Sequence, residues 1–314
     1  MRVSHVAINA PIPAVLDDGG DGDGAANVMR RPTRVRPLYG DFGPVLPASR
    51  VPGVADFEGA FWVSARQNGV YQTWAPVHTM FSRGNISEKA RIMRLPTLGT
   101  CLSGGGAGPG RWEGKCAAVD LYAGIGYFAF SYARAEGVGR VVGWEVCGWS
   151  VEGLRRGAVG NGWGVKVVDW VEGDGEVDLG GEEKIVVFRE DNVNALRRIE
   201  RMRDRLPPVR HVNCGLLPTS RASWEVAVGV LDPVEGGWIH AHENIAVKDV
   251  ESTKDDIVKT FTKLANGDEQ DTRNQRSVEC QHLERVKSYA PGVMHCVLDI
   301  YLPPPTPISP VQEG

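Results

Sequence analysis

The eleven-residue run AVDLYAGIGYF at 118–128 has the residue types of a site for a small polar cofactor. A strand that enters a glycine-rich turn and then a helix lets backbone amides approach a ligand closely, and the helix N-terminus adds partial positive charge. Gly124 and Gly126, with Ala129, also satisfy G-x-G-x-x-A. The spacing alone therefore leaves a nicotinamide dinucleotide site open.

Acidic residues at strand ends favour one cofactor over the other. Asp120 lies four residues before Gly124, where a carboxylate is unfavourable beside a pyrophosphate but suits the ammonium of a methionine moiety. Glu145 lies 21 residues after Gly124 and can accept both hydroxyls of a ribose, whichever cofactor is bound. Asp191 and Asn192 follow the third strand, where this fold commonly contacts adenine. A carboxylate that caps the next helix is the alternative for each acid alone, but the combination favours S-adenosylmethionine.

The elements that must position these residues alternate between short apolar runs and amphipathic stretches from 116 to 232. This alternation predicts a parallel sheet with helices on both faces. The predicted strands are 116–122, 140–146, 185–188, 211–217 and 237–245, and the predicted helices are 126–136, 149–159, 192–204, 220–231 and 250–264. Two late strands, near 284–289 and 293–301, flank a hairpin-like turn at 290–292. We therefore expect an α/β protein with the class I S-adenosylmethionine-dependent methyltransferase (Rossmann-like) fold.

Polar, glycine-rich segments divide the chain. At roughly 150 residues per domain, 314 residues suggest about two domains. The predicted units are a smaller N-terminal domain at 1–100, a catalytic Rossmann-like domain at 115–302 and a disordered tail at 303–314.

Composition excludes several classes of protein. The longest uncharged apolar stretch, 121–133, has 13 residues, fewer than the roughly 18 of a membrane helix, and no secretory signal is visible. The six cysteines form no C-x-x-C pair, and His240 and His242 lack a third ligand at suitable spacing, so no metal is expected. The formal charge of −4 restricts any nucleic-acid contact to a local patch. These features predict a cytoplasmic protein.

Several strings in chain order resemble one family. The most specific is S-R-G-N-x-x-E-K-x-R at 82–91, and the others are WAP at 74–76, DLYAGIGYF at 120–128, NCGLLPTS at 213–220 and GWIHAHEN at 237–244. Together they resemble the eukaryotic, especially fungal, wybutosine-synthesizing protein 2 family, which consists of tRNA aminocarboxypropyltransferases. The resemblance extends from about residue 3 to about residue 301.

This resemblance implies a reaction and a set of site residues. The reaction is transfer of the 3-amino-3-carboxypropyl group of S-adenosylmethionine to C7 of 4-demethylwyosine at position 37 of tRNA(Phe), with release of methylthioadenosine. Ser82 and Lys89 fall on cofactor-binding positions, Glu145 on the ribose position, and Asp191 with Asn192 near adenine. The implied partner is the anticodon region of tRNA(Phe).

The reaction sets physical demands on the site. The methionine Cγ, and not the methyl carbon, must lie in line with the nucleophile, so the amino-acid tail needs its own anchors, and Lys89 is a plausible partner for its carboxylate. An electron-rich ring carbon needs little activation, and no strong general base is evident. The base must leave the anticodon stack. We expect Asn213 and Pro218 to line its pocket. The aromatic faces of Tyr127, Phe128 or Trp74 could also receive the base, although core packing is the better explanation of each.

Three alternatives stay open at this point. A tRNA guanine-37 N1-methyltransferase shares the fold, although the stretch 213–218 lacks the compact Asn-Leu-Pro of that family. A tRNA-binding protein that holds S-adenosylmethionine without turnover is the second alternative. A nicotinamide-dependent oxidoreductase is the third, and the cofactor that raises the melting temperature would distinguish it.

Overall fold

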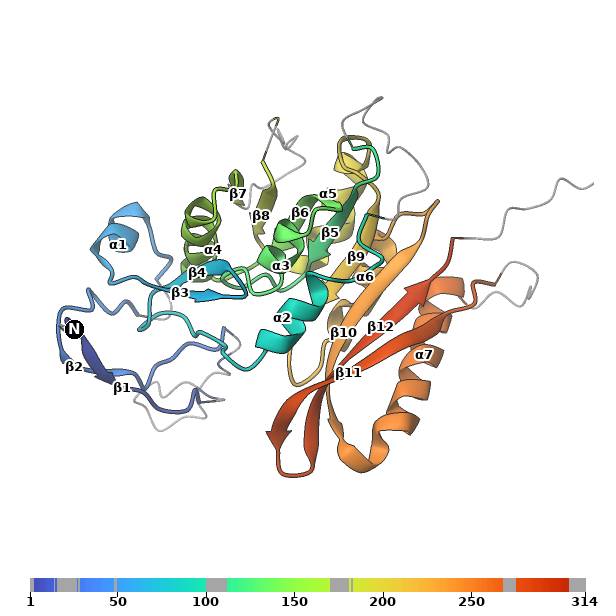
Figure 1. Ribbon diagram of the computed structural model, residues 1–314. Helices are drawn as coiled ribbons and strands as arrows, with labels where there is room; N and C mark the ends of the chain where they lie inside the picture. The colour runs from blue at the N-terminus through green and yellow to red at the C-terminus, as the bar shows by residue number, and fades with distance from the viewer. Residues whose placement is uncertain are drawn as a thin grey trace, which may run out of the picture.

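The computed structural model describes residues 3–13, 15, 27, 29–47, 50–99, 112–169, 181, 183–267 and 275–304. Its central feature is a large sheet, whose strands are labelled from one edge strand to the other in Figure 1. Its strands within the described residues are β5 (Cys116–Asp120), β6 (Val138–Trp144), β7 (Val165–Asp169), β8 (Ile185–Arg189), β9 (Val209–Cys214), β10 (Gly237–Ala246), β11 (Glu279–Ala290) and β12 (Val293–Leu302). They lie in the order β11-β12-β10-β9-β5-β6-β8-β7.

The strand directions confirm the predicted topology. From β7 to β10 every neighbouring pair is parallel, whereas β12 is antiparallel to both β10 and β11. The chain leaves β5 toward β6 on one side and returns to β9 on the other, so the strand order reverses at β5. Ligands of open α/β sheets bind at such a switch point, beyond the carboxyl ends of the strands.

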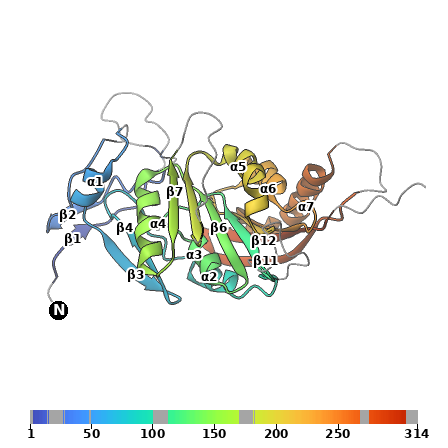
Figure 2. The ribbon, with the colours of Figure 1, turned by 90° about the horizontal axis from the view of Figure 1, so that it is seen from above.

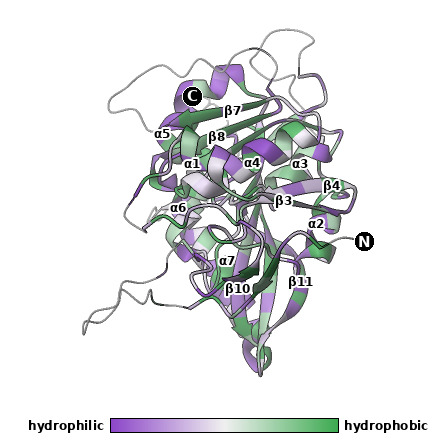
Figure 3. Cartoon of the chain, turned by 90° about the vertical axis from the view of Figure 1, so that its left-hand side faces the viewer, coloured by the Kyte–Doolittle hydropathy of each residue, from purple (hydrophilic) through white to green (hydrophobic). Residues whose placement is uncertain are grey.

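Helices cover both faces of this sheet (Figure 2). On one face lie α3 (Ala129–Arg134) and α4 (Gly148–Gly160), and on the other α5 (Ala195–Met202), α6 (Trp224–Val230) and α7 (Val250–Asn266). Successive residues of β5 point to opposite faces, so Ala117 and Val119 pack on the α5 to α7 side and Cys116 and Ala118 on the α3 side. β8 is hydrophobic along most of its length in Figure 3, as expected of a strand covered on both faces.

The N-terminal elements gather beside α4 and in front of the sheet (Figure 1). They are the antiparallel strand pair β1 (Val6–Ile8) and β2 (Arg36–Tyr39), helix α1 (Val54–Gly59), the hairpin β3 (Val63–Gln67) with β4 (Val70–Trp74), and helix α2 (Ile86–Ile92). β4 packs closely on α4, because a Cβ at Gly153 would lie 2.7 Å from the carbonyl oxygen of Thr73. The predicted division into domains stays a prediction, and 305–314 of the predicted tail lie outside the described residues.

The structure differs from the prediction at three elements in particular. β7 was not predicted, because its residues are mostly half-buried at the sheet edge and show no clear alternation. The predicted helix 192–204 is divided into a 3-10 turn η1 (Asn192–Asn194), α5 and a second 3-10 turn at 203–205. β11 begins five residues before the predicted strand near 284. Its first residues pair with β12, but the prediction missed them because they are polar. Among the described residues, no helix is both long and apolar enough to cross a membrane.

Candidate functional site

The carboxyl ends of β5 and β9 bring Asp120 and Asn213 side by side in the sheet. Asp120 is fully buried, and its Oδ1 accepts hydrogen bonds from Asn213 Nδ2 (3.0 Å) and the Tyr122 amide (3.3 Å). Its Oδ2 accepts one from the Ala129 amide at 3.0 Å, at the start of α3. Burial raises the pKa of Asp120 to about 6, although these hydrogen bonds oppose the rise. The carboxylate therefore fixes both ends of the glycine turn, and its predicted contact with a ligand ammonium stays a prediction.

The glycine turn has the backbone that the sequence predicts. Gly124 (φ +55°) and Gly126 (φ +93°) adopt left-handed conformations that favour glycine. Glu145, at the end of β6, accepts hydrogen bonds from the Gly124 amide at its Oε2 (2.9 Å) and the Cys147 amide at its Oε1 (2.7 Å). Burial raises the pKa of Glu145 to about 6. A carboxylate has about four acceptor positions, so Glu145 can accept from a hydroxyl in addition to these backbone amides, which is what ribose recognition requires.

The two residues after β8 differ in their contacts. Asp191 is exposed and accepts a hydrogen bond from the Val193 amide (2.9 Å), which is the helix-capping geometry of the alternative interpretation. Asn192 donates to the carbonyl oxygen of Leu121 at 2.8 Å, which ties this segment to the end of β5. Both residues thus lie at the edge of the sheet that carries Asp120 and Glu145.

Lys89 is a buried cation on α2. Its side chain is almost inaccessible to solvent, and its ammonium donates to Gln67 Oε1 (3.0 Å), Gln72 Oε1 (3.1 Å) and the Ser82 carbonyl oxygen (3.4 Å). Burial, with a smaller contribution from the charge of Lys287, lowers the pKa of Lys89 to about 8. Within the described chain, none of these hydrogen-bond partners is a carboxylate. Because buried charges are normally paired, this ammonium is suited to bind an anionic ligand group.

Aromatic contacts join Lys89 to the glycine turn. The Lys89 ammonium lies 5.0 Å from the centre of the Tyr127 ring and 5.6 Å from that of Phe81. The Tyr127 hydroxyl donates to the Met80 carbonyl oxygen at 2.5 Å, so the residue after Gly126 holds the segment before α2. The structure thus brings Ser82 and Lys89 next to the glycine turn, which lies about 40 residues later in the sequence. Ser82 contributes its backbone carbonyl to this contact.

The residues predicted to line the acceptor pocket lie in different environments. Asn213 is completely buried, whereas Pro218 is exposed on the loop after β9, where its carbonyl oxygen accepts from the Asn244 amide at 2.9 Å. Phe128 is buried with its ring edge-on to His242, and Trp74 stacks on Phe81 with ring centroids 4.2 Å apart. Both aromatic side chains therefore have the packing contacts that the alternative interpretation expects.

Sequence reasoning missed a buried polar layer on one face of β9, β10 and β12. Asp299 accepts hydrogen bonds from His240 Nδ1 (2.7 Å) and from both terminal nitrogens of Arg91 on α2 (2.6 and 3.0 Å). His242 lies beside it on β10, with its own partners on β9 and β12. The alternation His-Ala-His at 240–242 was the available signal, and it indicated structural histidines. No metal site of three or more His, Cys, Asp or Glu is found in the part of the chain that the structure describes.

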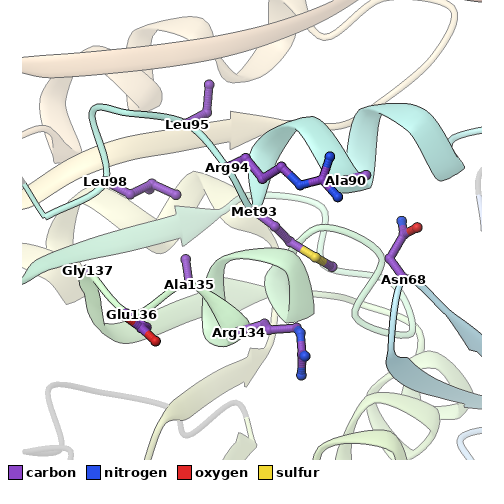
Figure 4. A pocket seen from close by; sticks show the side chains of 10 residues that line it. All are labelled: Asn68, Ala90, Met93, Arg94, Leu95, Leu98, Arg134, Ala135, Glu136 and Gly137. Carbon is purple, nitrogen blue, oxygen red and sulfur yellow. The ribbon is translucent and has the colours of Figure 1, made fainter.

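A separate cavity of about 800 Å³ opens between the C-terminal ends of α2 and α3 (Figure 4). Its lining includes Met93 and Arg94 after α2, Arg134 and Glu136 around the end of α3, and Asn68 from the turn between β3 and β4. None of the residues predicted to bind the cofactor lines it. It lies away from the switch point, so it is distinct from the site built around Lys89 and Asp120.

Comparison of the amino-acid sequence with known proteins identifies a family. The chain is 42% identical over 300 residues to the tRNA wybutosine-synthesizing protein 2 of Schizosaccharomyces pombe, covering 95% of the chain and 61% of that protein. Over these residues, the chain belongs to the tRNA wybutosine-synthesizing protein 2 family. It is 32% identical over 321 residues to the Saccharomyces cerevisiae protein of the same name, covering 95% of the chain and 60% of that protein. The resemblance predicted from the sequence is thus confirmed.

The match to the wybutosine-synthesizing protein 2 family covers only part of the length of the relatives. The chain spans about three fifths of the length of these two relatives. A search against protein-family models finds no match. Among solved structures, "M. jannaschii TYW2 in complex with AdoMet" superposes with a TM-score of 0.57 at 17% identity, over 87% of this chain and 91% of that one. This likeness confirms the predicted fold.

Proposed function

We propose that this protein transfers the 3-amino-3-carboxypropyl group of S-adenosylmethionine to C7 of 4-demethylwyosine at position 37 of tRNA(Phe), releasing methylthioadenosine. The proposal is supported by the names of the two fungal relatives and by the buried ammonium of Lys89. It includes the anticodon region of tRNA(Phe) as partner and the cytoplasm as location.

The observation that carries the proposal is the set of partners around Lys89. A carboxypropyl donor has a free carboxylate on the group that is transferred, so that carboxylate needs a fixed cation. The Lys89 ammonium has amide and carbonyl oxygens around it, and it lies against Tyr127 of the glycine turn. An incoming carboxylate would complete the neutralisation that the protein itself leaves open. The residues present therefore fit this donor.

The remaining donor contacts follow from the strand ends. In the proposal, the Glu145 carboxylate accepts hydrogen bonds from the ribose hydroxyls, and Asp120 attracts the ammonium of the transferred group. Asn192 and Asp191 lie beside adenine, and Ser82 helps to shape the tail site. Asn213 and Pro218 contact the acceptor base. With anchors at both the carboxylate and the ammonium, the tail can be held so that Cγ faces the nucleophile.

The chemical step is a substitution at carbon. C7 of the base forms a bond to Cγ, the bond between Cγ and sulfur breaks, and the electron pair stays on sulfur, so methylthioadenosine leaves as a neutral thioether. C7 then loses its proton to solvent and regains its double bond. Orientation decides the product, since all three carbons on the sulfonium are activated by the same charge.

The test is incubation with S-adenosylmethionine and tRNA bearing 4-demethylwyosine, followed by mass spectrometry of nucleosides and small products. We expect a nucleoside gain of one aminocarboxypropyl group with release of methylthioadenosine. A methyl gain with S-adenosylhomocysteine would instead show a tRNA methyltransferase, and donor binding without product would show a non-catalytic binding protein. Glu145→Ala should lose donor binding, whereas Glu225→Ala, an exposed glutamate on α6, should retain it.

A further inference from the structure

A line of four buried side chains crosses the sheet from the donor site to β12. Asn213 on β9 donates to Asp120 on β5, and its Oδ1 lies 3.2 Å from Nε2 of His242 on β10. Nδ1 of His242 lies 3.0 Å from Nε2 of His295 on β12. Each of the four side chains is at most 1% exposed. The contacts of Asp120 and Asn213 thus continue across β10 to β12, and His295 lies outside the sequence motifs.

The charge of the Asp120 carboxylate decides which atom donates and which accepts in every hydrogen bond of this line. An ionised carboxylate only accepts, so Asn213 must turn its amide nitrogen toward Asp120 and its oxygen toward His242. That oxygen accepts only, so His242 must carry its proton on Nε2. A neutral His242 then accepts at Nδ1, and His295 must carry its proton on Nε2. Burial supports the neutral forms, because it lowers the pKa of His242 well below its ordinary value and that of His295 to about 4.

The far end of the line is an acceptor without a partner. Nδ1 of His295 is buried and makes no hydrogen bond within the described residues. Because His295 Nε2 is held as a donor to His242, this Nδ1 is the nitrogen without a proton. The ring of Phe128 packs against His242 with centroids 4.9 Å apart, which leaves the imidazole little freedom to turn.

We propose that His242 and His295 are positioning residues of the transfer reaction, which hold the Asn213 amide and, through it, the Asp120 carboxylate in the orientation that the donor's ammonium requires. The inference rests on the proposed function for what Asp120 binds. Neither histidine touches the donor in this proposal. Without the proton on His242 Nε2, the Asn213 amide has no donor at its oxygen and loses the restraint on its orientation.

The first test reads the protonation pattern directly. We expect ¹⁵N-edited NMR of the histidine-labelled chain at neutral pH to show His242 and His295 as neutral tautomers with the proton on Nε2. Loss of one signal in His242→Gln assigns His242, and loss of one signal in His295→Gln assigns His295. A proton on Nδ1 of His242, or a charged imidazole, would overturn the inference. This readout does not depend on catalysis, so it stands even if the acceptor tRNA is wrong.

The second test compares three variants by donor calorimetry and steady-state kinetics. His242→Leu fills similar space without the donor proton, and we expect donor affinity and kcat to fall about tenfold or more, with the KM for tRNA unchanged. His242→Gln places an N–H near the position of Nε2 and should recover most of the loss. His282→Leu, an exposed histidine on β11, is the matched control and should behave as wild type.

The outcomes separate this inference from the proposed function. Wild-type donor affinity in a folded His242→Leu protein would overturn the inference alone. Equal losses in His242→Leu and His242→Gln would also overturn it, because the imidazole would then matter for packing and not for its proton. Absence of donor binding by the unmodified chain would overturn the proposed function itself.

Discussion

The buried ammonium of Lys89 carries a cost in stability. Its ordinary pKa of 10.5 falls to about 8, so the charged form is less favourable inside the protein than in water. Between pH 8 and 10.5 the unfolded chain holds more protons than the folded one, and the stability therefore rises with pH across that window. At neutral pH the shift corresponds to a cost of about 3 kcal/mol.

Replacement of this charge should stabilise the free protein and remove its ligand. We expect Lys89→Met to raise the free energy of unfolding at pH 7 by up to about 3 kcal/mol, because the desolvated charge is gone. The same variant should lose measurable S-adenosylmethionine binding. Urea unfolding and calorimetry measure the two effects. A destabilised Lys89→Met protein would show that the ammonium contributes to the fold through Gln67 and Gln72.

The affinity of the protein for S-adenosylmethionine should fall at both low and high pH, which gives its pH profile an acidic and an alkaline limb. Asp120 and Glu145, each with a pKa of about 6, must be ionised, and Lys89, with a pKa of about 8, must be protonated. Affinity should therefore be greatest between about pH 6 and 8, fall below 6 as the carboxylates gain protons, and fall above 8 as Lys89 loses one. Calorimetry from pH 5 to 9 measures both limbs. Lys89→Arg should shift the alkaline limb upward, and an unchanged limb would contradict its assignment to Lys89.

At the scale of elements, α2 is held to the sheet by ion pairs. Arg91 binds Glu88 within the helix (2.7 Å) and Asp299 on β12 (2.6 Å). The charges of His240 and Arg91, with their hydrogen bonds, hold the pKa of Asp299 below its ordinary range although burial opposes this. The stability that Asp299 contributes is thus present above about pH 4 and is lost as pH falls further. Because α2 also carries Lys89, the same contacts position the proposed donor site.

We expect removal of the Arg91 guanidinium to loosen α2. Arg91→Met leaves the buried carboxylate of Glu88 without its cation and that of Asp299 with His240 alone, and it should lower the free energy of unfolding by roughly 3 kcal/mol. Donor affinity should fall with it. Arg155→Met on α4 is the control, since that arginine is 44% exposed and its pair with Glu152 should contribute less than about 1 kcal/mol. Equal effects in chemical unfolding would contradict the anchoring role of Arg91.

At the scale of the whole molecule, the N-terminal hairpin β3–β4 and the Rossmann-like sheet are joined through α4. Gly153 faces the Thr73 carbonyl oxygen so closely that a methyl group has no space, whereas Gly160 in the same helix has nothing within 4 Å of its Cβ position. We expect Gly153→Ala to destabilise the protein by about 1–3 kcal/mol and Gly160→Ala to be neutral or slightly stabilising. Thermal unfolding of both measures the difference. Similar melting temperatures would mean that the hairpin is free to move away from α4.

Beyond residue 116 and apart from β7, the sequence by itself determined the order of strands and helices. It also determined the glycine turn and the acids at the ends of β5 and β6, because these features depend on local periodicity and on backbone conformations that favour glycine. It also carried the family resemblance. Only the tertiary structure decided that Lys89 is a buried cation with uncharged partners, that Asp191 caps a helix turn, and that Asn213 continues into a line of histidines. Those properties depend on which strands become neighbours and on which side chains are shielded from water. The strands β9, β10 and β12 meet only when the sheet forms.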